Sequence, residues 1–153
     1  MKKIIVALTL VLFSLNLYSA EIKWEKDFFS AIKKAKKENK PIMFVISRHS
    51  CKYCTILADT TFKDKKFVDT INKDFVAVKA YAEAGSKDYI PAYLYVNSTP
   101  TTWFLYKNGL SLYPNSVAGA IPTKDFVDIL ELVKARYKEV TKEGKYDDIC
   151  NCK

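Results

Sequence analysis

The sequence lacks several features that would assign it to other classes of protein. After residue 20 it has no further hydrophobic run long enough to cross a membrane, and it has neither an internal repeat nor a low-complexity segment. The residue after Cys54 is Thr55 rather than histidine, which excludes covalent haem attachment. No cysteine directly follows Ala20, so nothing indicates a lipid anchor. The 153 residues, 49% of them hydrophobic and 14% aromatic, therefore predict one globular domain.

The first twenty residues have the pattern of a secretory signal peptide. Lys2 and Lys3 form a basic start, residues 4–13 form an apolar centre, and Leu17–Ala20 is a small-residue cleavage site. We expect cleavage near Ala20 and a periplasmic protein, with an uncleaved membrane anchor as the alternative. An oxidising compartment would permit disulfides.

The formal net charge of +8 is spread along the chain apart from one dense run, Lys33–Lys37. Apolar residues with helical spacing lie opposite that run: Trp24, Phe28, Ile32 and Ala35. The run is therefore interpreted as a solvated helix face, and we expect no nucleic-acid partner.

Hydrophobic periodicity predicts alternating helices and strands. In chain order we expect a helix over 24–39, a strand over 41–47, a helix capped by Ser50, a short helix around 67–71, strands over 75–81 and 101–106, a hairpin strand over 110–113, and a helix capped by Thr123. Residues 82–98 form an irregular connection, and residues 141–153 form a polar tail outside the core. Strands separated by a helix are parallel and strands joined by Asn108–Gly109 are antiparallel, so the sheet should be mixed.

Two cysteines separated by two residues, Cys51-Lys52-Tyr53-Cys54, follow the first of these strands. Such a pair can open and close one disulfide. With Ser50 as N-cap, Cys51 would lie at the positive end of a helix dipole next to the Lys52 cation. Both effects favour a thiolate, which makes Cys51 the predicted nucleophile.

Several segments resemble the thioredoxin-like superfamily, in its exported branch that serves thiol–disulfide interchange. They are the dithiol and the segments 39–44, 61–64, 99–102, 108–109 and 117–120. The resemblance runs from about Trp24 to Tyr137 and implies an α/β fold, a three-layer α/β/α sandwich with a mixed central sheet. The expected organisation is a signal peptide over 1–20, a thioredoxin-like domain over 21–140 and a tail over 141–153.

The resemblance also implies roles for the site residues. Pro100 would be a cis proline against the dithiol, and the backbone of Thr99 would pair with an extended substrate. Cys51 would attack a substrate disulfide and Cys54 would resolve the mixed disulfide, without a bound cofactor.

Two positions depart from the thioredoxin pattern. Ser50 stands where thioredoxins carry tryptophan, and Val45 stands where they carry a buried acidic residue. His49, the only histidine, could lower the thiol pKa or shuttle a proton, or it could be an exposed loop residue. Lys52 and Tyr53 are further candidate modulators.

The remaining cysteines and aromatic residues leave alternatives open. Cys150 and Cys152 could form a second redox pair, a strained disulfide or a bond to a partner chain. A zinc site of all four cysteines is disfavoured by the C-x-C spacing and by export, so we predict no metal. The residues Tyr89, Tyr93 and Tyr95 either border the dithiol groove or pack under a loop.

The sequence thus predicts a periplasmic thiol–disulfide oxidoreductase, a reductase or interchange protein. Its expected partners are exported proteins bearing disulfides or thiols and a membrane-bound thiol electron donor. The alternatives are an isomerase or oxidase with the same site, or a binding module whose cysteines are structural or bind metal. The oligomeric state is not indicated.

Overall fold

A mixed sheet forms the centre of the computed structural model, which describes residues 21–94, 96–144 and 146–147. The strands within these residues are β1 (Trp24–Glu25), β2 (Ile42–Ser47), β3 (Val76–Tyr81), β4 (Thr101–Leu105) and β5 (Val117–Ala118). Their order in the sheet is β1-β3-β2-β4-β5. β3 is parallel to both β1 and β2, whereas β4 is antiparallel to both β2 and β5. The predicted mixed sheet is confirmed, and the signal-peptide prediction falls on residues 1–20, outside the described part.

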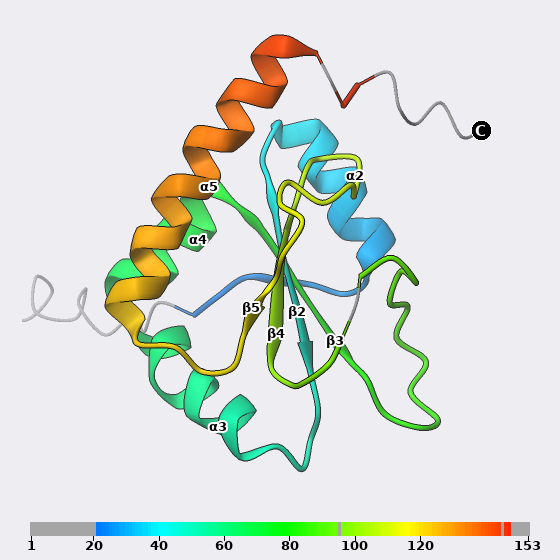
Figure 1. Cartoon of the computed structure of the whole chain (residues 1–153), viewed down its shortest axis with the longest axis vertical. Helices are drawn as coiled ribbons and strands as arrows, with labels where there is room; N and C mark the ends of the chain where they lie inside the picture. The colour runs from blue at the N-terminus through cyan, green and yellow to red at the C-terminus, as the bar shows by residue number, and fades with distance from the viewer. Residues whose placement is uncertain (1–20, 95, 145, 148–153) are drawn as a thin grey trace, which may run out of the picture.

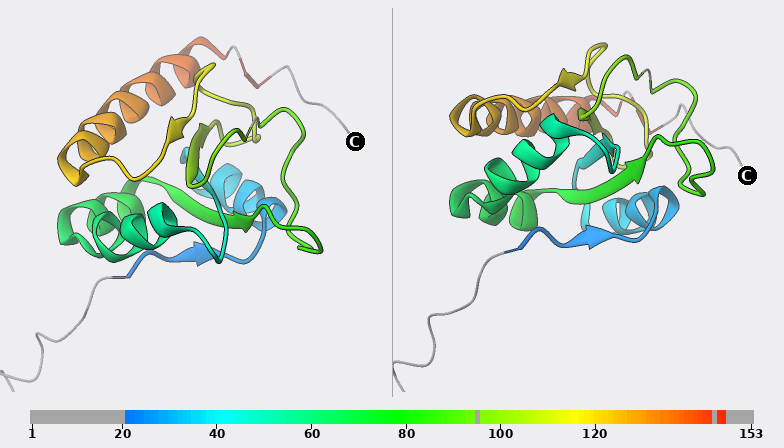
Figure 2. Two further views of the ribbon diagram at one scale, coloured as in Figure 1. Left: turned by 60° about the horizontal axis from the view of Figure 1, so that its bottom comes forward. Right: turned by 90° about the horizontal axis from the view of Figure 1, so that it is seen from below.

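Helices cover both faces of this sheet (Figures 1 and 2). They are α2 (Phe28–Glu38), α3 (Lys52–Asp59), the 3-10 turn η1 (Thr61–Lys63), α4 (Lys65–Asp74) and α5 (Thr123–Glu143). α2 packs on one face, while α3, α4 and α5 lie on the other (Figure 1). The three-layer α/β/α sandwich predicted from the sequence is confirmed.

The central strand β2 is buried on both faces, as expected for a strand with helices on either side. No side chain from Ile42 to Ile46 is more than 1% exposed. Met43 and Val45 belong to the core cluster shared with α4 and α5, and Phe44 and Ile46 belong to the cluster shared with α2. Each such side chain contributes about 1.5–3 kcal/mol by burial, so β2 anchors both layers.

The first helix begins later than the sequence predicted. Trp24, expected in the helix, instead lies in β1 and pairs with Ala77 of β3. Asp27 is the N-cap, because its carboxylate accepts the Ser30 backbone N–H and the Ser30 hydroxyl accepts the Asp27 N–H. This capping box fixes the start at Phe28, and the spacing of Trp24 with the helical apolar residues is coincidental.

The predicted hairpin turn is present, but its second strand is not. At Asn108–Gly109 the Tyr106 N–H donates to the Leu110 carbonyl at 2.7 Å, and the Gly109 N–H donates to the Tyr106 carbonyl at 2.8 Å. The predicted strand over 110–113 is reduced to a bridge between Leu105 and Ser111. Ser111 donates its hydroxyl to the Tyr113 carbonyl in a local turn, and Pro114 has no N–H for a ladder. On the side of β4 that faces away from β2, the antiparallel neighbour is β5 instead of the predicted strand.

The last helix and the segment after it also correct the prediction. Pro122 is the N-cap of α5, whereas Thr123, the predicted cap, shares a hydrogen bond with the Thr61 hydroxyl at 2.9 Å. The helix runs to Glu143, and beyond it the Tyr106 hydroxyl donates to the Asp147 carboxylate at 3.0 Å. Residues 141–144 and 146–147 therefore pack with the domain rather than in a separate tail. Cys150 and Cys152 lie outside the described residues.

In the part of the chain that the structure describes, no helix combines the length and the apolar character needed to span a bilayer.

Substitution of Gly109 tests whether the turn packs closely against α2. Its φ is +95°, and an added Cβ would lie 3.0 Å from Ile32 Cδ1 and 3.1 Å from Phe28 Cζ. Gly109→Ala should lower the free energy of unfolding by about 2–5 kcal/mol, the sum of a left-handed backbone penalty and overpacking. Urea denaturation measures it.

Gly119→Ala is the matched control, because Gly119 has a φ of +81° and open space around its Cβ position. It should cost only about 1–2 kcal/mol, the backbone penalty alone. Equal losses in the two variants would contradict the proposed packing of the turn on α2.

Candidate active site

The dithiol lies where the chain leaves β2 and enters α3 (Figure 1). Cys51 itself is the N-cap of α3, with φ −129° and ψ 108°, and its Sγ accepts the Cys54 backbone N–H at 3.1 Å. The prediction that Ser50 caps the helix and places Cys51 in the first turn is therefore wrong by one residue. The Cys51 thiolate is still favoured, because as the N-cap the sulfur directly faces an N–H at the positive end of the helix.

Cys51 and Cys54 are joined by a disulfide, with their Cα atoms 5.2 Å apart. The two residues differ in accessibility: Cys51 is half-buried, whereas Cys54 is 9% exposed and belongs to the core. A nucleophile that attacks another protein must be reachable, and a resolving thiol need only reach its neighbour. The difference in burial agrees with the predicted roles, Cys51 attacking and Cys54 resolving.

Thr99 and Pro100 lie against Cys51. The Thr99–Pro100 peptide bond is cis, and Pro100 is buried. Cys51 Sγ lies 3.3 Å from the Thr99 carbonyl oxygen and 3.4 Å from the Thr99 hydroxyl. The hydroxyl can donate to the sulfur in the disulfide and in the thiolate, whereas the carbonyl can accept from the sulfur only when Cys51 is a thiol.

Hydrogen bonds to the end of β3 hold the loop that precedes the dithiol. The Arg48 Nε donates to the Ala82 carbonyl at 2.8 Å. Glu83 accepts the His49 backbone N–H, and its other oxygen lies 2.7 Å from His49 Nδ1. The backbone N–H of His49, followed by its ring, lowers the pKa of Glu83. The His49 ring stacks on Tyr81 at 4.1 Å between centroids. His49 is thus an anchored residue although its side chain is 69% exposed.

A small hollow of about 230 Å³ opens beside Cys54. Val45, Pro100 and Lys79 line it together with His49 and Cys54. Lys79 is the parallel-strand partner of Val45, the residue that stands where thioredoxins carry an acid. Burial lowers the pKa of Lys79, and its Nζ lies 4.7 Å from the centroid of the Trp24 ring. Lys79 thus lines the hollow beside the resolving cysteine together with Asp59, and no acid stands at the Val45 position.

The surface next to the dithiol is partly apolar. Lys52, the first residue of α3, is exposed, as are Tyr53 at 59% and Ile56 at 38%. Tyr53 and Ile56 are three residues apart on a helix and so occupy one side of it. The two predicted modulators, Lys52 and Tyr53, are thus placed at the entrance to the site.

Tyr89 and Tyr93, which precede Thr99 in the sequence, do not lie at the dithiol. The Tyr89 ring packs on Phe28 and Phe29 of α2, with centroid distances of 5.6 and 4.9 Å. The Tyr93 hydroxyl donates to the Gly109 carbonyl at 2.8 Å. Neither lines the hollow beside Cys54, which favours the packing interpretation over the groove. Tyr95, Cys150 and Cys152 lie outside the described residues, and their roles stay predictions.

Sequence reasoning missed Glu83 and Lys79. Glu83 lies in the irregular connection, where no periodicity indicates which side chain turns back to His49. Lys79 is the one charged residue in the apolar strand Val76–Tyr81, and that charge was the available signal.

Comparisons with known proteins agree with this geometry. The family model for the thioredoxin-like domain matches residues 28–134. No curated protein sequence matches the chain.

Solved structures share the fold at low sequence identity. A thioredoxin from Thermus thermophilus is 19% identical, with a TM-score of 0.68 over 85% of this chain and 99% of its own. The oxidoreductase DsbH is 17% identical, with a TM-score of 0.64 over 80% and 90%. A proposed disulphide isomerase from Bacteroides thetaiotaomicron is 25% identical, with a TM-score of 0.63 over 75% and 94%.

The matched residues 28–134 contain the sheet from β2 to β5, the dithiol and the Thr99–Pro100 bond. On the evidence of this match, the chain belongs to the thioredoxin-like domain family.

Proposed function

We propose that this protein is an exported thiol–disulfide oxidoreductase that reduces or exchanges disulfides in other exported proteins. The thioredoxin-like domain and its Cys-x-x-Cys pair support thiol–disulfide oxidoreductase activity. The observation that carries the proposal is the position of Cys51 Sγ, half-buried at a helix start and 3.3 Å from the Thr99 carbonyl. A purely structural disulfide would not require a partly accessible sulfur next to a backbone group that can bind a peptide.

The reaction needs two exchanges. In the reduced protein, the Cys51 thiolate attacks one sulfur of a substrate disulfide, and the other substrate sulfur leaves as a thiolate that takes up a proton. The Cys54 thiolate then attacks the Cys51 sulfur of this mixed disulfide, and the second substrate sulfur leaves. The substrate gains two electrons and the protein ends as the Cys51–Cys54 disulfide. Exchange of this kind requires no bound cofactor.

Thr99 supports binding of an extended peptide segment. Within the described residues, no hydrogen bond uses the Thr99 backbone N–H, so this N–H is available for a strand-like partner. Tyr53 and Ile56 add exposed apolar surface beside it. A site made of backbone groups and apolar contacts suits many unfolded or partly folded substrates rather than one sequence.

Lys79 supplies the charge for the resolving step. It lines the same hollow as Cys54 and is half-buried, so its positive charge is less screened than at the surface. A nearby cation favours ionisation of a thiol. We assign to Lys79 electrostatic stabilisation of the Cys54 thiolate, a different role from that of the buried acid in thioredoxins, and the proton of Cys54 passes to water in the hollow.

Export and regeneration complete the proposal. The signal-peptide pattern of residues 1–20 supports export, and DsbH is the name of one similar structure. A membrane-bound thiol donor would return the Cys51–Cys54 disulfide to the dithiol. The similar structure described as a proposed disulphide isomerase supports isomerisation by the same residues as the second candidate function.

Cysteine variants test the proposed roles. Cys51→Ser should abolish reduction of insulin by the protein with dithiothreitol as electron source, because the attacking sulfur is lost. Cys54→Ser should retain attack but accumulate mixed disulfides with substrate, which non-reducing gels and mass spectrometry detect. Insulin reduction that survives in Cys51→Ser, or substrate trapping by Cys51→Ser instead of Cys54→Ser, would overturn the assignment.

Thr99→Val tests the hydroxyl contact with Cys51. Loss of one hydrogen bond to the thiolate, about 0.5–1.5 kcal/mol, should slow alkylation of Cys51 by iodoacetamide at pH 7 by roughly two- to tenfold. Thr55→Val is the matched control, because the Thr55 hydroxyl donates to the Cys51 carbonyl rather than to the sulfur. If both variants react as fast as the wild type, the Thr99 hydroxyl does not stabilise the thiolate.

Lys79→Met tests the positioning role of the buried cation. Resolution of a preformed mixed disulfide at Cys51 should slow several-fold, on the order of 1 kcal/mol of lost charge stabilisation. Alkylation of Cys51 should be unchanged, and Lys79→Arg should restore resolution. A variant that slows alkylation and resolution equally would instead indicate a general structural defect.

A further inference from the structure

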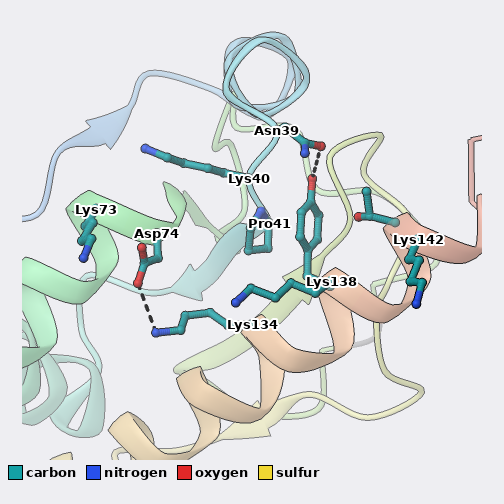
Figure 3. Close-up of a pocket in the computed structure, with 10 residues that line it drawn as sticks. Asn39, Lys40, Pro41, Lys73, Asp74, Lys134, Lys138 and Lys142 are labelled. Atoms are coloured by element: carbon teal, nitrogen blue, oxygen red, sulfur yellow. Dashed lines mark hydrogen bonds and ion pairs between the residues drawn. The ribbon is translucent and has the colours of Figure 1, made fainter.

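A second hollow, of about 660 Å³, lies at the other end of the sheet from the dithiol. The segment that joins α2 to β2, the last turn of α4 and the second half of α5 surround it (Figure 3). Since β2 has six residues and a strand rises about 3.3 Å per residue, the dithiol lies about 20 Å away at the far end of β2. The hollow is therefore separate from the redox site.

Lysines dominate the lining of this hollow. They are Lys40, Lys73, Lys134, Lys138 and Lys142, and Figure 3 shows that they come from all three surrounding elements. Asp74 is the one carboxylate among the lining residues. The five lysines outnumber the carboxylates in contact with them, Asp74, Glu38 and Glu131, so the hollow carries a net positive charge, which attracts anions.

Carboxylates pair with only two of these five lysines. Lys134 binds Asp74 at 3.1 Å and Glu131 at 2.8 Å, and Lys40 binds Glu38 at 2.8 Å. Among the residues that the structure describes, the other three have no ion-pair partner: Lys73, Lys138 and Lys142. These three exposed lysines line the hollow, and their charge is uncompensated.

The neutral groups in the hollow also suit an anion. Burial raises the pKa of Tyr137 far above its usual range, so the hydroxyl stays protonated and donates to Asn39 Oδ1 at 3.1 Å. The Asn39 oxygen also accepts from Lys107 at 3.4 Å. The acceptor side of Asn39 is thus occupied, whereas no hydrogen bond within the described residues uses its NH₂ group, which is a donor.

We propose that this hollow binds a small molecule carrying two or more phosphate groups. Lysine binds phosphate as a point charge, and cations placed on three sides match several charges better than one. The volume falls in the range of small-molecule sites and exceeds the need of a single simple anion. A free phosphate compound and the headgroup of a diphosphorylated lipid present this same chemistry.

Calorimetric titration with inorganic tripolyphosphate tests the site in the intact protein. Lys73→Gln/Lys138→Gln removes two uncompensated charges and should weaken binding about tenfold or more, since each close charge contributes roughly a factor of five. Lys66→Gln/Lys124→Gln is the matched control, because it removes two exposed lysines at the opposite ends of the same helices, α4 and α5. It should change the dissociation constant less than about twofold.

Three outcomes would overturn the proposal: no binding by the wild type, no weakening in Lys73→Gln/Lys138→Gln, or equal weakening in both double variants. Lys142→Gln, a single exposed change near the end of α5, serves as a second variant should the double variant unfold by circular dichroism, and it should weaken binding about threefold to fivefold.

Vesicles distinguish the two sources of phosphate. Sedimentation with cardiolipin vesicles but not with phosphatidylcholine vesicles, lost in Lys73→Gln/Lys138→Gln and kept in Lys66→Gln/Lys124→Gln, identifies a lipid headgroup. Tripolyphosphate binding without such sedimentation identifies a free phosphate compound. Sedimentation unaffected by Lys73→Gln/Lys138→Gln would overturn the lipid assignment.

Discussion

The pairing of β2 with both β3 and β4 is the constraint on which the site depends. Ile46 pairs with Thr101 on one side and with Ala80 on the other, so three chain segments end or begin next to one another at this edge of the sheet. The dithiol follows β2, Thr99 precedes β4, and Glu83 follows β3. A slip of one residue would turn every β2 side chain to the other face, which the burial of the strand on both sides prevents. The core thus sets the distance between Cys51 and Thr99.

The chemistry at this edge follows from groups that favour negative charge on sulfur. Cys51 Sγ accepts a backbone N–H at the start of α3 and lies within reach of the Thr99 hydroxyl. Lys79 places a partly desolvated cation on the side of Cys54, while Glu83 holds His49 and its loop in place. The half-buried Cys51 and the buried Cys54 agree with the proposed division of attack and resolution between them.

Much of this arrangement was predictable from the sequence, for identifiable reasons. The mixed sheet followed from apolar runs separated by helical spacing, and the dithiol followed from the spacing of Cys51 and Cys54. The three-layer sandwich and the roles of Thr99 and Pro100 came from the resemblance to the thioredoxin-like superfamily. Local capping was not predictable: Asp27 rather than Trp24 sets the start of α2, and Cys51 rather than Ser50 caps α3. The Glu83 contact and the lysine hollow were missed because they join residues distant in sequence, which no periodicity records.

We propose that the Cys51–Cys54 pair is an exchangeable couple in a reducing or interchange site. The decisive measurement is the reduction potential of this couple, obtained by equilibration with glutathione or dithiothreitol and mass spectrometry of the trapped thiols. We expect a value between about −270 and −180 mV, the range from thioredoxin to protein disulfide isomerase. A value below about −300 mV would indicate a structural disulfide and one near about −120 mV an oxidase, and either value would overturn the proposed function.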